Sequence, residues 1–413
     1  MPGEGADTDN RNILALAAPA FIGGLGGGVV FPILPLLGLQ LGIPAALIGL
    51  ILSINRIVRL TVNPLTGWVV DRFGARWPLI LGLLIEAVST LCFHVGAHAA
   101  YAAAWFLFGR VPWGVGSSLL MIGALSVALM FASETGAGLA TAKVRMSLSL
   151  GMPAGLVLGG LVAAQASPDA AFLAAAAITF VGALYAWRFA PRGTRPAHAA
   201  LREHEPKPAV GLRELLRPGP LWSPWLFNFF TFFGAQGVVL SVLTLLVRDR
   251  HLSFAGWGVE GTAGALMAMM IGGSALIAWQ VGRRIDSSRR KTASLAVGVL
   301  LLAGFALLAV SWQIAVAVAA LALIGAGLGG INTPLLLIIG ELAPAGSHGR
   351  AIGIYQVLGD LGGSLGPIIG LEALLRYGGV ATLLSLTALL GFMLPLVVVL
   401  WRWEMRRWKE NAD

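Results

Sequence analysis

Charged residues are scarce in this chain. Only 11% of its 413 residues are Asp, Glu, Lys or Arg, whereas 57% are hydrophobic. A soluble domain carries roughly 25% charged residues, so this composition cannot cover a globular surface with polar groups. The scarcity excludes a soluble globular protein and indicates that lipid surrounds most of the side chains.

Cysteine and metal-ligand clusters are lacking as well. The single cysteine, Cys92, lies in an apolar segment, which excludes an intrachain disulfide and argues against a cysteine-based metal site. The six histidines show no metal-ligand spacing, and the sequence has no Walker loop for ATP. We therefore expect no metal and no cofactor, and the sequence shows no constellation of polar residues typical of a membrane enzyme.

Long apolar runs dominate what is present, and each supplies the roughly 20 residues that cross a bilayer. The runs predict twelve spanning helices at 13–37, 45–70, 78–97, 101–130, 143–166, 170–190, 221–247, 257–281, 292–311, 313–340, 350–375 and 380–401. One long polar interruption, 191–220, predicts a linker. We expect an all-α membrane protein with a six-helix half at 1–190 and a second at 221–413.

The 28 lysines and arginines are distributed unevenly between the two sides of the predicted membrane. One side carries most of them, and the other has only Arg248, Arg250 and Arg376. Cytoplasmic loops carry an excess of Lys and Arg, so we expect both termini and the linker to be cytoplasmic, in an inner membrane. Because the basic residues lie in these short loops, the net charge of +9 does not indicate nucleic-acid binding.

Two sequence patterns occur once in each half. The pattern Gly67-x-x-x-Asp71 recurs as Gly282-x-x-x-Asp286. Three glycines at intervals of four also recur, first as Gly151, Gly155 and Gly159 and then as Gly362, Gly366 and Gly370. The offsets between the copies nearly agree, which predicts a duplicated six-helix unit, as is common in transporters.

The loop after the second predicted helix reads Gly67-Trp-Val-Val-Asp71-Arg72-Phe-Gly74-Ala75-Arg76. On this loop the chain resembles the major facilitator superfamily, and the resemblance extends over essentially the whole sequence. Ala75 departs from the pattern, since the family often has a basic residue there. The resemblance implies twelve helices in two six-helix pseudo-repeats that move a small solute by alternating access.

The resemblance places this loop in a cytoplasmic gate between the halves. The expected gate residues are Gly67, Asp71, Arg72, Gly74 and Arg76, with Glu134 as a partner for Arg76, and in the second half Gly282, Asp286 and Arg290. An ordinary interfacial turn with cations that reach the headgroups is the alternative interpretation.

Two further runs resemble motifs of proton-coupled members. The fourth predicted helix carries Arg110 followed by Pro112, Trp113 and glycines, similar to the family's motif near the coupling site. The fifth resembles the antiporter motif of drug exporters, although its proline precedes the second glycine. In the fifth helix the run consists of Gly151, Pro153, Gly155 and Gly159. A run in the second half, Gly366, Pro367 and Gly370, matches the antiporter motif better. Close helix packing explains the same glycines.

Ionisable residues at bilayer depth cost about 2.5–3.5 kcal/mol on insertion scales, so they usually face a cavity or a partner. Five candidates for proton coupling arise in this way: Arg56, Arg59, Glu86, Arg110 and Asp360. We expect Arg59, or Arg56, to pair with Asp360 in one state, so that protonation of Asp360 is linked to the conformational switch. A static ion pair is the alternative, and Glu86 is either a coupling residue or a locally paired structural acid.

Polar groups from both halves predict the solute cavity. Arg110, Trp113 and Ser117 share one face of the fourth helix, while Asn228, Gln236 and Asn332 come from the second half. An interhelical hydrogen bond explains each of Asn228, Gln236 and Asn332 equally well. Basic and neutral groups outnumber acids, which favours a polar or anionic solute such as a siderophore or an organic acid.

The sequence thus predicts a secondary transporter, a proton-driven exporter of a small polar or anionic solute. Its expected partners are the solute, protons and the bilayer, and we expect a monomer. A broad-specificity drug efflux antiporter and a proton-coupled importer remain as alternatives. A non-transporting membrane sensor or a membrane enzyme is a candidate of another class, which the short linker and the lack of a catalytic cluster disfavour.

Overall fold

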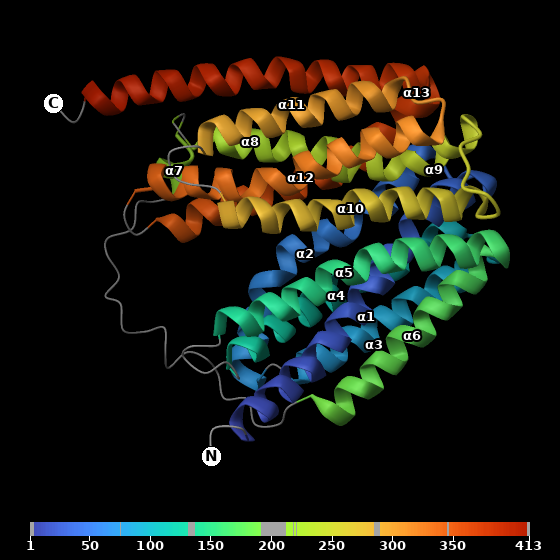
Figure 1. Ribbon diagram of the computed structural model, residues 1–413. Helices are drawn as coiled ribbons and strands as arrows, with labels where there is room; N and C mark the ends of the chain where they lie inside the picture. The colour runs from blue at the N-terminus through green and yellow to red at the C-terminus, as the bar shows by residue number, and fades with distance from the viewer. Residues whose placement is uncertain are drawn as a thin grey trace. The chain divides into compact units, whose positions relative to one another are not determined.

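The computed structural model describes residues 4–74, 76–130, 137–190, 212–217, 219, 221–284, 290–344 and 347–410. All regular elements within these ranges are helices (Figure 1). They are α1 (Glu4–Gln40), α2 (Ala45–Phe73), α3 (Arg76–Gly96), α4 (Ala102–Met130), α5 (Ala137–Gln165), α6 (Pro168–Phe189), α7 (Leu212–Leu215), α8 (Trp222–Thr231), the π-helix η2 (Phe232–Val239), α9 (Leu240–Asp249), α10 (Gly258–Arg284), α11 (Arg290–Ala309), α12 (Ile314–Leu342) and α13 (His348–Glu410).

Among the described residues, 11 helical stretches are long and apolar enough to cross a membrane. One of them, Trp222–Asp249, combines α8, η2 and α9. Another, His348–Pro395, has 48 residues, more than twice the roughly 20 needed for one crossing. Its backbone breaks at Gly378 (φ 81°, ψ 166°), a conformation that glycine adopts without steric cost. With the two arms of α13 counted separately, the predicted all-helical membrane fold is confirmed.

By its contacts the chain divides into two compact units, Met1–His204 with Leu243–Ala268, and Glu205–Val242 with Met269–Asp413. In the first unit α1 packs along α5 and α6, α3 packs against α4 and α6, and α2 packs against α4 (Figure 1). In the second unit α13 packs against α8, η2 and α11, and α11 packs against α12. Of the predicted linker, the structure describes only α7 and a few neighbouring residues.

Aromatic side chains fill the core of the first unit between three helices. Phe93 of α3 stacks on Phe106 of α4 with 5.4 Å between ring centroids, and Phe172 of α6 lies 5.5 Å from Phe93. All three rings are fully buried. They hold α3, α4 and α6 together by burying large apolar surfaces.

The glycines of α5 allow its backbone to touch α1. A Cβ atom built on Gly151 would collide with the carbonyl oxygen of Phe21, and one on Gly155 would collide with that of Leu25. Because the obstacles are backbone atoms, they cannot rotate away as a side chain can. Close approach of two helices through small residues is typical of membrane bundles.

The second unit repeats this arrangement between α13 and the stretch formed by α8 and η2. A Cβ atom on Gly362 would collide with the carbonyl oxygen of Phe229, and one on Gly366 would collide with the Cα atom of Gly237. The recurring glycines therefore make equivalent contacts. Those of the fifth spanning helix, α5, meet the first, α1. Those of the eleventh spanning helix, the first arm of α13, meet the seventh, which consists of α8, η2 and α9. This equivalence is consistent with two pseudo-repeats.

Replacing Gly155 by leucine should lower the thermal unfolding midpoint of the protein in detergent markedly, because overpacking against backbone costs about 1–3 kcal/mol or more. Gly273→Leu in α10 is the matched control, since a Cβ atom there meets no atom within 4 Å. Leucine favours helix over glycine at both positions, so a difference between the variants reports packing alone. Equal midpoints for the two variants would contradict the close contact of α5 with α1.

Candidate functional site

Arg110 of α4 lies in the interior of the first unit, with none of its surface exposed. Its three guanidinium nitrogens, Nε, Nη1 and Nη2, have no hydrogen-bond partner among the residues that the structure describes. The guanidinium carbon lies 4.9 Å from the ring centroid of Trp113 and 5.7 Å from that of Phe31 in α1. Cation–π attraction of this kind is worth about 2 kcal/mol when desolvated, and it leaves the N–H donors of the guanidinium available to a ligand.

Glu86 of α3 is the acidic counterpart of Arg110. Only 1% of Glu86 is exposed, and within the described ranges neither carboxylate oxygen has a hydrogen-bond partner. Arg110 and Glu86 attract each other electrostatically. An ionised carboxylate buried without hydrogen bonds costs several kcal/mol, so Glu86 needs a proton, the charge of Arg110 or a ligand.

Glycines lie against the side chains of Glu86 and Trp113. A Cβ atom on Gly23 of α1 would lie 3.1 Å from Oε2 of Glu86, and one on Gly116 of α4 would lie 3.0 Å from its Cγ. On the next turn of α1, a Cβ atom on Gly27 would lie 2.9 Å from the ring of Trp113. The side chains of Glu86 and Trp113 therefore lie close against glycine positions, where an added Cβ atom would force a shift.

Helix α2 adds positive charge and an amide to this group. Arg56 is buried and Arg59 partly buried, and the charges of both reach Arg110. The side-chain oxygen of Asn55 is buried without a hydrogen-bond partner. We refer to Asn55, Arg56, Arg59, Glu86, Arg110 and Trp113 as the arginine cluster. It holds three guanidinium groups and one carboxylate, so its chemistry suits an anionic or hydrogen-bonding ligand.

A buried hydrogen-bonded set ties α2 to α4 beside the cluster. Ser118 donates to the side-chain oxygen of Asn63 (2.6 Å), and its hydroxyl lies 2.9 Å from that of Thr66. Ser117, predicted for the cavity, donates to the Gly114 carbonyl oxygen within its own helix (3.1 Å). Sequence analysis missed the set, because a serine or threonine in an apolar run gives no sign of which helix it meets.

Two residues predicted for the cavity, Asn228 and Asn332, lie in a hydrogen-bonded network of the second unit. Asn228 donates to the backbone oxygen of Tyr355 (2.8 Å), and the Tyr355 hydroxyl donates to the side chain of Asn332 (2.7 Å). Tyr355 is almost fully buried, so the network joins α8, α12 and α13. The side-chain oxygen of Asn228 has no hydrogen-bond partner and remains available.

Gln236 and Asp360 complete the predicted residues of the second unit. Gln236 lies partly buried in η2, and π-helical turns of this type occur frequently at functional sites. Asp360 is partly buried in α13, where its backbone oxygen accepts a hydrogen bond from Ser364 (2.7 Å). Arg59 belongs to the first unit and Asp360 to the second, and their pairing stays a prediction.

The predicted gate loop forms the end of α2. Gly74 ends the helix with φ 78°, and the guanidinium of Arg72 lies over the rings of Trp68 and Phe73, 5.6 and 5.8 Å from their centroids. Arg76 donates to the backbone oxygen of Trp187, which ties the start of α3 to the end of α6.

Several gate residues lie at the limits of what the structure describes. Glu134 and Asp286 lie outside the described residues, so the expected pairing of Glu134 with Arg76 stays a prediction. Asp71 belongs to α2 and Arg290 to α11, and Gly67 and Gly282 meet no atom within 3.5 Å of a Cβ position.

The remaining residues of the packing motif follow the same pattern as their neighbours. Pro153 lies inside α5 and Pro367 inside α13. A Cβ atom on Gly159 would lie 2.8 Å from Val29, and one on Gly370 would lie 3.0 Å from Val238.

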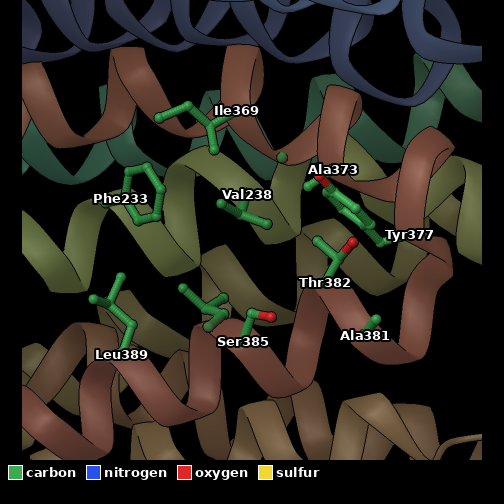
Figure 2. A pocket seen from close by; sticks show the side chains of 11 residues that line it. Phe233, Val238, Ile369, Ala373, Tyr377, Ala381, Thr382, Ser385 and Leu389 are labelled. Carbon is green, nitrogen blue, oxygen red and sulfur yellow. The ribbon is translucent and has the colours of Figure 1, made fainter.

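The second unit also contains an apolar cavity of about 480 Å³ between η2 and the two arms of α13. Figure 2 shows Phe233 and Val238 between Ile369 and Tyr377 of one arm and Thr382 and Ser385 of the other. No predicted cavity residue and no charged side chain lines it. The arginine cluster therefore suits a polar solute better than this cavity does.

Comparison with known proteins shows matches along most of the chain. The family model of the Major Facilitator Superfamily matches residues 16–367. The Multidrug resistance protein 2 of Bacillus subtilis is 28% identical over 150 residues, 36% of either chain. The Bacillibactin exporter of the same organism is 31% identical over 115 residues, 26% of this chain and 27% of that protein. These two matches thus span about a third of each relative, whereas the Multidrug efflux protein YfmO of B. subtilis is 26% identical over 362 residues, 87% of this chain and 85% of that protein.

Solved structures show the same fold. The human organic anion transporter MFSD10 (TETRAN) has a TM-score of 0.63 and 21% identity, over 94% of this chain and 99% of that one. The nucleoside transporter NupG has a TM-score of 0.75 and 15% identity, over 94% and 98%. Since the family model covers most of the chain, and the described helices follow the fold of solved members, this multi-pass membrane protein belongs to the major facilitator superfamily and is a transporter, not an enzyme.

Proposed function

We propose that this protein is a proton-driven exporter of a small polar or anionic organic solute, siderophore-like or an organic acid. It works in the inner membrane with both termini in the cytoplasm, and the halves 1–190 and 221–413 open the site alternately to the two sides. The observation that carries the proposal is the fully buried Arg110, whose guanidinium donates no hydrogen bond to any described part of the chain.

The composition of the arginine cluster supports the solute class. A guanidinium held between two aromatic rings presents its donors in a fixed plane, which suits a carboxylate or another planar anionic group. Arg56 and Arg59 raise the positive charge further, and repel cations. The site therefore attracts an anionic or acceptor-rich solute and repels a cationic one.

Glu86 supplies a reason for coupling to protons. A solute that donates a hydrogen bond to the Glu86 carboxylate, and accepts one from Arg110, binds more tightly when Glu86 is ionised, because a charged acceptor forms a stronger hydrogen bond. A proton on Glu86 removes the negative charge and weakens that acceptor, so proton and solute compete for Glu86. Competition between proton and solute at one site is the requirement for antiport, in which protons entering the cell drive the solute out.

Two alternatives rest on specific observations. Relatives named for multidrug resistance and multidrug efflux support a broad-specificity drug antiporter. The pair Glu86 and Arg110 also permits import, because an anion without a donor group competes with ionised Glu86 for Arg110 and binds together with the proton. The Bacillibactin exporter among the relatives supports export of a siderophore-like solute over both alternatives.

We retain a second titratable element from the sequence, the pairing of Arg59, or Arg56 one turn earlier, with Asp360 in one conformational state. Protonation of Asp360 then separates the pair and permits the switch. Glu86 selects between proton and solute in this scheme, and Asp360 links the outcome to the movement of the halves.

Arg110→Gln should weaken binding of the transported solute by at least about tenfold, because it removes a desolvated charged donor. Binding to purified protein in detergent, followed by isothermal titration, measures the change. Arg376→Gln is the matched control, since Arg376 is exposed and pairs with Glu372 (2.6 Å) on its own helix. Equal affinities of Arg110→Gln and the control would contradict the site.

Asp360→Asn should abolish proton-coupled transport while solute binding persists. Inverted membrane vesicles are energised, a pH-sensitive dye records the gradient, and apo-siderophores, organic acids and cationic drugs are added one at a time. We expect a siderophore or organic acid to collapse the gradient in wild-type vesicles and not in the variant. Undiminished collapse in Asp360→Asn would disprove the role of Asp360, and accumulation in right-side-out vesicles alone would establish an importer.

A further inference from the structure

A second groove, separate from the arginine cluster, lies on the second unit where α8 and α13 begin. It has a volume of about 440 Å³. Its lining includes Trp222, Trp225, Arg350, Gly353, Ile354 and Val357. The candidate spans of these helices start at Trp222 and His348, so the groove begins at a membrane boundary.

The floor of the groove is rigid and apolar. Trp225 is fully buried, and its indole nitrogen donates to the backbone oxygen of Ala351 (3.1 Å). The ring of Trp222 packs edge-on against it, with 6.0 Å between centroids. The indole nitrogen of Trp222 is buried and has no hydrogen-bond partner among the described residues, so this wall holds an unsatisfied donor.

Gly353 keeps the groove open. A Cβ atom there would meet no atom within 4 Å, so the groove depends on a missing side chain and not on close helix packing. Val357, one turn further along α13, and Leu216, after α7, are 43% and 42% exposed. Large apolar side chains at this level of exposure are typical of surfaces covered by another apolar group.

The charged end of the groove lies at the membrane boundary, and its apolar part lies deeper. Arg350 lies at its outer end, and Leu358, eight residues later on α13, lies roughly 12 Å deeper at 1.5 Å per residue. Exposed Arg213 and Arg217 add positive charge on the linker side. A cation at the boundary followed by an apolar wall matches an anionic lipid, whose headgroup is charged and whose chains are apolar.

We propose that this groove binds one anionic phospholipid of the bilayer. The phosphate group lies at Arg350 and accepts the indole N–H of Trp222, and one acyl chain follows Ile354, Val357 and Leu358 over the floor formed by Trp225. The lipid thereby joins the start of α8 to the start of α13 on the linker side. This inference does not depend on the identity of the transported solute.

Native mass spectrometry of the full-length protein, delipidated in detergent and titrated with phosphatidylglycerol, tests the proposal. We expect the wild type to retain one phosphatidylglycerol more tightly than phosphatidylcholine. Arg350→Gln should weaken this binding by about tenfold, because it removes a charge-assisted contact with the phosphate. Gly353→Leu should abolish it, because the added side chain fills the groove.

Arg376→Gln and Gly273→Leu serve as matched controls, since they make the same exchanges at exposed or open positions outside the groove. Leucine at Gly353 should leave the unfolding midpoint unchanged or raise it, so that lost binding does not reflect lost folding. Retention of the tight lipid by Gly353→Leu would overturn the site. Equal binding of phosphatidylcholine, unaffected by Arg350→Gln, would overturn the choice of an anionic lipid.

Discussion

The burial of a charged guanidinium beside a carboxylate, away from water and without hydrogen bonds to either, is the constraint on which the first unit depends. Transfer of such ions into a medium of low dielectric costs several kcal/mol each unless pairing compensates. Arg110 and Glu86 reduce this cost by mutual attraction, and Phe31 and Trp113 reduce it by cation–π contact. The part of the burial cost that these contacts do not offset is relieved when a proton or a solute binds.

The helix packing follows from the same requirement. Glu86 and Trp113 pack against Gly23, Gly27 and Gly116, which present no side chains to them. The glycines of α5 pack closely against α1, and the same helix α1 supplies Phe31 to the guanidinium. Helix packing and ligand site therefore use one set of small residues, and the two interpretations of the glycine runs are compatible.

Much of the fold could be predicted from the sequence, because length and hydropathy decide which segments enter a bilayer. The twelve apolar runs correspond to the described helices, although the break at Gly378 is so tight that α13 continues through two of them. The π-helix η2 was not predicted, since its hydrophobic pattern does not differ from that of an α-helix.

The site was harder to predict, because sequence alone does not show how each helix is rotated about its axis. Arg110 and Glu86 were identified by their charge in apolar helices, yet nothing indicated that they share one cluster. Asn228 and Asn332 were expected either in the cavity or in an interhelical hydrogen bond, and each is hydrogen-bonded to Tyr355. Tyr355 itself was missed, because a single tyrosine in an apolar helix has no distinguishing pattern.

The central claim is that proton and solute compete through Glu86. Proton release into weakly buffered detergent solution, recorded while the solute identified in the vesicle assay binds the purified protein, tests this most directly. We predict that wild-type protein releases protons on binding and that Glu86→Gln binds the solute more weakly and without release, since glutamine keeps a neutral acceptor oxygen and does not titrate. Release of as many protons by Glu86→Gln as by the wild type would contradict the account.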